Sequence, residues 1–80
     1  MHIAFDAREV AGEVLTRVPA LMEAWKQAAQ SGAIRSVTSA GRSYAVVSDP
    51  ALVARIRAAS PQMEVYRYDE DTETLSDAAS

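Results

Sequence analysis

Apolar residues recur at alternating intervals of four and three along residues 7–28, the spacing that one face of an α-helix produces. Asp6 precedes this stretch as an N-cap, and Glu9 follows three residues later, a pair typical of a capping box. Gly32 marks the end of the pattern, where a left-handed residue would terminate the helix. The positions that form the apolar stripe are Ala7, Ala11, Val14, Val18, Leu21, Trp25 and Ala28.

Pro19 lies in the middle of this pattern. Proline lacks a backbone donor and its ring clashes with the preceding turn, so it kinks or splits a helix. Because the apolar stripe keeps its phase on both sides of Pro19, we predict one long, kinked N-terminal helix. The stripe exceeds what the few remaining elements can cover, which predicts a homodimer formed through this helix.

The pattern changes to β alternation over residues 35–38 and 42–47. The short loop between them contains Gly41, which is available for a positive φ. Two alternating segments joined by such a loop are typical of a β-hairpin.

A second, shorter helix is predicted after the hairpin, with Asp49 as its N-cap and Pro50 at its first position. Pro61 ends it, and residues 63–68 alternate as a final short strand. The predicted fold is therefore α+β, with the order α-β-β-α-β. Residues 2–5 could add a first strand, which would give β-α-β-β-α-β, the ferredoxin-like order, and the pattern leaves both orders open.

The chain has 80 residues and no cysteine, so we expect one small domain without disulfides or thiolate metal sites. We assign residues 1–68 to this domain and residues 69–80 to an acidic, flexible tail, because the tail contains one large apolar residue, Leu75. No segment has the character of a membrane span or of a signal peptide, which favours a cytoplasmic protein.

Charge is divided unevenly along the chain. Residues 1–63 carry seven basic and five acidic side chains, whereas residues 64–80 carry six acidic side chains and one basic side chain, Arg67. The net charge of −3 therefore combines a mildly basic body with an acidic end. This asymmetry predicts a basic partner and repulsion of nucleic acid.

Residues with catalytic chemistry are few. His2 is the only histidine and stands beside the terminus, so the sequence contains no recognisable pair of nucleophile and base. Glu9 and Glu13 lie one turn apart on a polar helix face, as solvated charges do. Residues 69–73 alternate carboxylates but lack the glycine and the final glutamate of a calcium loop. We predict no catalytic residue, no metal site and no cofactor.

The acidic end is better suited to binding. Tyrosine and arginine favour protein interfaces, and carboxylates attract cationic surfaces. We predict a non-catalytic interaction module, an inhibitor or adaptor analogous to phage-encoded anti-CRISPR and antitoxin proteins. It presents acidic residues to a basic, nucleic-acid-handling protein and does not bind nucleic acid itself. The predicted partner-binding residues are Glu64, Tyr66, Tyr68, Asp69, Glu70, Asp71 and Glu73.

The segment of residues 28–58 reads Ala-Ala-Gln-Ser-Gly at its start, then Arg-Ser-Val-Thr before a Gly-Arg turn, then a helical stretch from Leu52 to Ile56. It resembles the small W-type head-tail joining proteins of tailed phages. The resemblance implies an α-β-β-α fold and, as an alternative function, a structural role in a phage particle. The residues that would then face DNA or the portal are Arg35, Arg42, Arg55 and Arg57.

Overall fold

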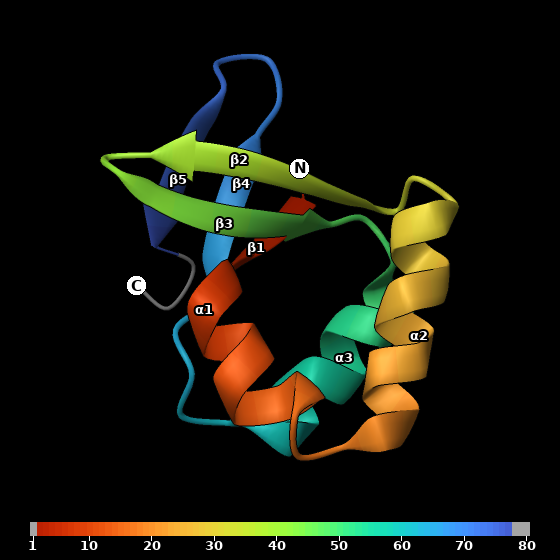
Figure 1. The fold of residues 1–80 in the computed structure, drawn as a ribbon. Coiled ribbons are helices and arrows are strands. Elements are labelled where there is room, and N and C mark those ends of the chain that lie inside the picture. The colour runs from red at the N-terminus through yellow and green to blue at the C-terminus, as the bar shows by residue number, and fades with distance from the viewer. Residues whose placement is uncertain (1, 78–80) are drawn as a thin grey trace.

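The computed structural model describes residues 2–77. Its strands form one antiparallel sheet in the spatial order β2-β3-β1-β4-β5, and the helices pack against one face of that sheet (Figure 1). Within these residues, no helix combines the length and the apolar composition needed to cross a membrane. The elements in chain order are β1 (His2–Asp6), α1 (Ala7–Val10), the π-helical turn η1 (Ala11–Leu15), α2 (Pro19–Gln30), β2 (Ile34–Ser39), β3 (Arg42–Val47), α3 (Pro50–Ala59), β4 (Tyr66–Asp69) and β5 (Thr74–Asp77).

The main core lies between the helices and one face of the sheet. Side chains alternate along a strand, so Ile3 and Phe5 of β1 share the face that packs against the helices. Ile34 of β2 lies opposite Val47 of β3 on the same face. The buried residues that complete this core are Val10, Val14, Leu15, Leu21, Ala28, Leu52, Val53, Ile56, Met63 and Val65.

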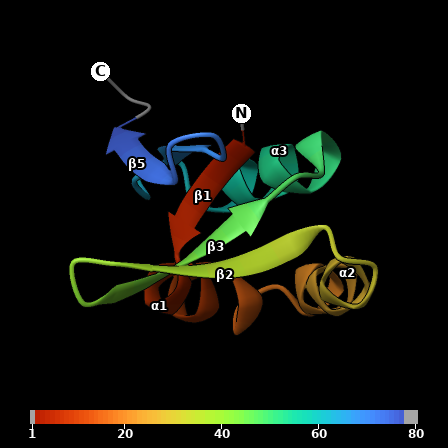
Figure 2. The same ribbon diagram turned by 90° about the horizontal axis from the view of Figure 1, so that it is seen from above.

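The other face of the sheet is concave and carries a second apolar cluster. Ala4 of β1 lies opposite Val46 on one side and Tyr66 on the other. In a flat sheet, β2 and β4 would be about 14 Å apart, since neighbouring strands are spaced by about 4.8 Å. The Cζ atom of Arg35 on β2 nevertheless lies 5.8 Å from the centre of the Tyr68 ring on β4. The sheet is therefore curled like half of a barrel, and Figure 2 shows the β2–β3 hairpin and β5 running in different directions on either side of β1.

The single long, kinked helix predicted for residues 7–28 is wrong. Residues 7–15 form α1 and η1, the chain turns at Thr16 and Arg17, and α2 begins afresh at Pro19. Figure 1 shows α2 running back up the molecule instead of continuing the axis of α1. Pro19 therefore starts a helix and does not bend one.

The residue before the proline explains this difference. A following proline disfavours the α region, and Val18 is extended, with φ −125° and ψ 93°. Pro19 then occupies the first turn of α2, where its missing donor costs nothing. The Thr16 N–H also bonds the Ala11 carbonyl at 3.1 Å, a π-type bond that widens the last turn of the first helix. The stripe keeps its phase because both helices pack on the same core.

The self-association predicted through the long helix depended on an uncovered apolar stripe. Val14, Leu21 and Ala28 of this stripe are instead buried within the domain. The chain's own sheet and α3 cover them. Val18 and Trp25 of the same stripe are only partly buried and Ala11 is exposed, so the homodimer stays a prediction.

The α+β class and the hairpin are confirmed. β2 and β3 pair along their whole length, from Ile34 opposite Val47 to Ser39 opposite Arg42. The single final strand is wrong, because both β4 and β5 form. The first strand that the pattern left open over residues 2–5 does form, as β1. Both predicted element orders lack the second N-terminal helix and the fifth strand. The fifth strand escapes prediction because its only large apolar side chain is Leu75.

The predicted flexible tail, residues 69–80, starts with the last residue of β4 and includes β5. Leu75 lies opposite Tyr68 and packs, partly buried, against the concave cluster. Residues 78–80 lie outside the described residues. That the domain folds without this segment stays a prediction.

Leu21 tests the corrected packing. It is 3% exposed in the main core, so Leu21→Ala should lower the free energy of unfolding by about 2–5 kcal/mol through lost burial and a cavity. The control, Glu23→Ala, changes an exposed residue of the same helix and should stay within about 0.5 kcal/mol of the wild type. Urea unfolding followed by circular dichroism measures both variants. Equal stability of the two would contradict the packing of α2.

Ala40 tests the hairpin turn. Ala40 and Gly41 have φ of 53° and 77°, as in the type I′ turn, for which Asn-Gly is preferred. Alanine is strained at positive φ, so Ala40→Asn should stabilise the domain by about 1 kcal/mol and Gly41→Ala should destabilise it by about as much. Thermal unfolding measures both changes. A lower midpoint for Ala40→Asn than for the wild type would show that this turn does not limit stability.

Candidate interaction surface

Four predicted acidic residues lie together at the turn between β4 and β5, one as the last residue of β4 and three in the turn itself, at the top of the molecule in Figure 1. We call this group the acidic turn: Asp69, Glu70, Asp71 and Glu73. The Asp71 N–H donates to Oδ1 of Asp69 at 2.9 Å. The hydroxyls of Thr72 and Thr74 are 2.7 Å apart and form a further hydrogen bond. The backbone of the turn is thus ordered by local bonds and by the paired strands on either side of it.

Glu70 is the member of the acidic turn that contacts the rest of the sheet. Its Oε1 meets Nε2 of His2 on β1, and its Oε2 lies 3.8 Å from Nη2 of Arg35 on β2. The Arg35 and Glu70 side chains are 54% and 48% exposed, and an ion pair at such a surface is worth about 0–1 kcal/mol. Pairing of β4 with β5 therefore positions the turn, and the contacts with His2 and Arg35 orient Glu70.

Glu64 and Tyr66 form a second group at the other end of β4. The Tyr66 hydroxyl donates to Oε2 of Glu64 at 2.6 Å. The Tyr66 and Tyr44 rings meet edge to face, with centroids 5.3 Å apart and planes at 74°. The hydrogen bond to the Glu64 carboxylate, together with burial and nearby negative charge, raises the pKa of Tyr66 to about 12. Tyr66 is therefore held as a neutral donor beside a carboxylate.

Tyr68 lies beneath the surface. It is 5% exposed, and the Arg35 guanidinium covers its ring in a cation–π contact. Arg67, between the two tyrosines, alternates to the opposite face of the strand. The predicted site residues are thus divided between the acidic turn at one end of β4 and the pair Glu64 and Tyr66 at the other, with Tyr68 packed in the sheet.

The sequence did not connect two residues of this surface, His2 and Arg35, with Glu70, although Arg35 was already a candidate for facing DNA or the portal. They reach Glu70 because the curled sheet brings β1 and β2 towards the β4–β5 turn. No local spacing connects residues so far apart in the chain. Only the strand order, with β1 between β3 and β4, could have indicated that they meet.

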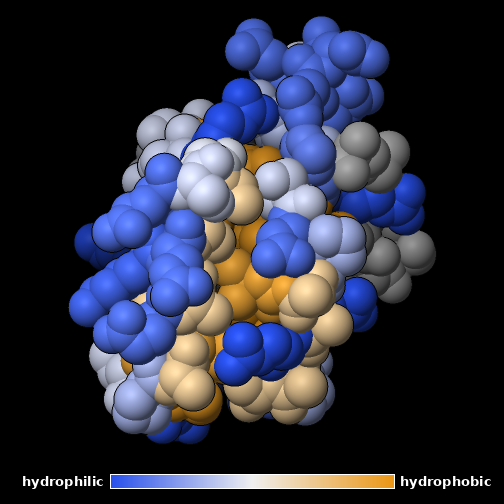
Figure 3. Space-filling view, turned by 90° about the vertical axis from the view of Figure 1, so that its right-hand side faces the viewer, coloured by the Kyte–Doolittle hydropathy of each residue, from blue (hydrophilic) through white to orange (hydrophobic). Residues whose placement is uncertain are grey.

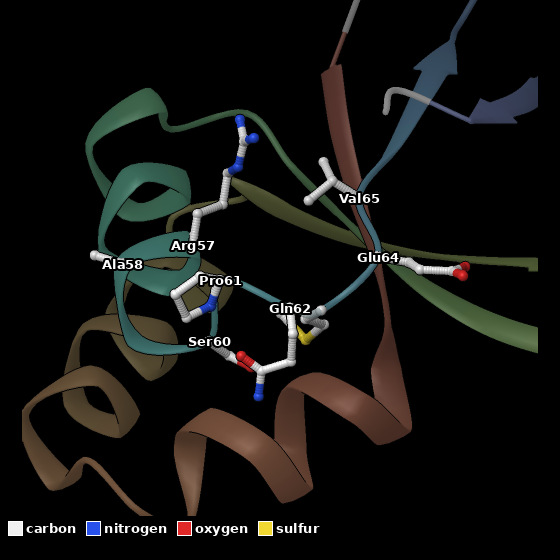
Figure 4. A pocket seen from close by; sticks show the side chains of 8 residues that line it. Arg57, Ala58, Ser60, Pro61, Gln62, Glu64 and Val65 are labelled. Atoms are coloured by element: carbon white, nitrogen blue, oxygen red, sulfur yellow. The ribbon is translucent and has the colours of Figure 1, made fainter. Parts of the chain in front are cut away.

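A cavity lies away from the acidic turn, between the end of α3 and the segment leading into β4 (Figure 4). Its volume is about 580 Å³, and its lining includes Arg57, Ser60 and Glu64. Figure 4 shows the Arg57 and Glu64 side chains pointing in different directions. The buried Ser60 hydroxyl has no partner in the described part of the chain, a position that ordered water commonly fills. The charged groups of this cavity do not converge on one point.

Within residues 2–77, no three histidine or acidic side chains come together in the way that a metal ion requires. Comparison with known proteins found no matching family, no matching curated protein and no matching solved structure. The geometry of the acidic turn and its surroundings is therefore the basis for a functional proposal.

Tyr66 tests this geometry through pH. The folded protein keeps the Tyr66 proton above the ordinary tyrosine pKa of about 10, so the stability from this bond is complete below pH ~10 and is lost as the pH rises to about 12. An ultraviolet absorbance titration should show one tyrosine ionising near pH 12, a step that Tyr66→Phe removes. Glu64→Gln should move this step towards pH ~10, because the charged acceptor is lost. An unmoved step would exclude the Glu64 bond as the cause.

Proposed function

We propose that this protein is a non-catalytic protein–protein interaction module, a small cytoplasmic inhibitor or adaptor that presents the acidic turn to a basic, nucleic-acid-handling partner. The exposed carboxylates of Asp71 and Glu73 make the first contacts. Glu64 and Tyr66, at the other end of β4, supply a second contact with an aromatic ring. The protein does not bind nucleic acid itself, because its carboxylates repel phosphate.

One observation supports this proposal above the others: the acidic residues stand on a turn whose ends are held by the sheet. Asp69 and Thr74 are partners across β4 and β5, so Asp71 and Glu73 keep a defined place at the molecular edge. Figure 3, a view of the right-hand side of Figure 1, shows hydrophilic side chains gathered at the top of the molecule, where Figure 1 places this turn. A preorganised turn loses less conformational entropy on binding than a flexible tail would.

The charges of the acidic turn act first on the rate at which the protein and its partner meet. Opposite potentials accelerate association, and salt removes that advantage because the Debye length is about 8 Å at physiological ionic strength. A surface that binds nucleic acid already carries the complementary lysines and arginines. The protein would therefore compete with phosphate groups for the same cations.

The alternative is a structural phage head-tail joining protein. The cations expected to face DNA are divided between the β2–β3 hairpin, which carries Arg35 and Arg42, and α3, which carries Arg55 and Arg57. Arg35 also pairs with Glu70 inside the domain. The interaction module is therefore the better-supported proposal.

A variant with both Asp71→Asn and Glu73→Gln tests the role of the turn. It should associate with a labelled oligoarginine peptide roughly three- to tenfold more slowly at low salt, with little change in dissociation, because electrostatic steering is lost. Stopped-flow fluorescence measures both rates, and the difference should disappear at high salt. The charge-matched control, Glu13→Gln with Glu23→Gln, removes the same charge from the helical side of the molecule and should leave the rates near those of the wild type.

The same peptide bound to single-stranded DNA tests competition. The wild-type protein should displace the DNA without binding it. In the stopped-flow experiment, an equal decrease of the association rate in the turn variant and in its charge-matched control would contradict a role for the turn. Direct, salt-sensitive binding of the protein to DNA would contradict the proposal and favour the hairpin that carries Arg35 and Arg42.

A further inference from the structure

An apolar groove lies beside the acidic turn. It has a volume of about 300 Å³ and runs between β1, the end of β3 and α3. Its walls include Ile3 and Val47 from the sheet and Val53 and Ala54 from α3. Figure 3 shows apolar side chains in a strip down the middle of one face, below the hydrophilic projection.

The groove is lined by one charged side chain, Arg57, and by His2 on the opposite side. His2 lines its β1 side, and Nε2 of His2 contacts Glu70, which joins the groove to the acidic turn. Arg57 lines its α3 side and forms no ion pair among residues 2–77. A segment that crosses the groove would therefore meet Arg57 on the α3 side and, beyond His2, the Glu70 carboxylate of the acidic turn.

The volume of the groove limits its occupant. Pockets for small molecules hold about 300–1,000 Å³, and this groove is at the lower end of that range. One large apolar side chain suits this space better than a cofactor does. Ile3 is only partly buried and Ala54 is exposed, so an inserted side chain would remove apolar surface from water at both positions.

We infer that the groove receives one large apolar side chain of the basic partner, from a segment with lysine or arginine on one side of it and a carboxylate on the other. This inference rests on the proposed function. The basic residues meet the acidic turn next to His2, and the carboxylate pairs with Arg57. The acidic turn then controls encounter, and the groove controls the lifetime of the complex, because apolar burial is not screened by salt as the charges are.

Two acetylated and amidated peptides test the groove: Lys-Lys-Phe-Gly-Asp, and the same peptide with serine in place of phenylalanine. Titration into the isotope-labelled full chain is followed by nuclear magnetic resonance. Both peptides should shift the amide signals of the acidic turn. Only the phenylalanine peptide should shift those of Ile3, Val53 and Ala54, and it should bind about ten- to a hundredfold more tightly.

Substitution at the mouth of the groove provides the matched control. Ala54→Arg places a long charged side chain at an exposed helix position that lines the groove, and should reduce the affinity of the phenylalanine peptide to that of the serine peptide. Ala59→Arg makes the same change at an exposed position of the same helix that does not line the groove. This control should bind both peptides as the wild type does.

The outcomes separate the two proposals. Equal affinity of the two peptides, with shifts only in the acidic turn, would overturn the inference that the groove binds an apolar side chain. The proposed function would still stand. No shift in the acidic turn with either peptide would overturn the proposed function and the groove together. Groove shifts that follow protein concentration instead of peptide concentration would identify a second copy of the chain as the occupant, which also overturns the inference.

Discussion

Strand β1 is paired with β3 on one edge and β4 on the other and is buried over residues 4–6, and the other elements are arranged around it. It requires a large side chain towards the helices and a small one towards the concave face. Phe5 and Ala4, both 0% exposed, meet these two requirements. A larger residue in place of Ala4 would press against Val46 and Tyr66, its register partners, and force the curl to open. That curl is what brings β2 within reach of the β4–β5 turn.

The sheet determines the positions of the surface charges, and these charges contribute little to the stability of the sheet. Exposed ion pairs contribute little free energy, whereas the backbone pairing of β4 and β5 determines where the carboxylates stand. Glu70 already has His2 and Arg35 as neighbours, so in the function we propose the contacts with a partner would fall mainly on Asp71 and Glu73. Because the internal pairs are weak, a cluster of cations on a partner can also compete for Glu70.

Local patterns predicted the elements whose causes are local. The hairpin follows from two alternating segments around Gly41, and α3 begins where Asp49 and Pro50 indicate, with Oδ1 of Asp49 accepting from the Ala51 N–H at 3.0 Å. The local sequence around Pro19 is consistent with two structures, a kink inside a helix or the first turn of a new helix. Tertiary packing decides between them, and Pro19 begins α2.

The parts that could not be predicted depend on contacts between distant segments. The charge step identified the acidic residues, but their arrangement on a turn needs β5, whose sequence has little apolar signal apart from Leu75. The burial of Tyr68 depends on the curl that places Arg35 above it.

Strand β5 lies at the edge of the sheet and pairs only with β4 among the described residues. Leu75 is the only large apolar side chain that β5 contributes, so we expect this hairpin to open at a lower free energy than the whole domain unfolds, a local fluctuation of the kind that amide hydrogen exchange detects. A partner that binds only the closed hairpin would suppress this opening, and recognition would then be coupled to the folding of the least stable part of the sheet.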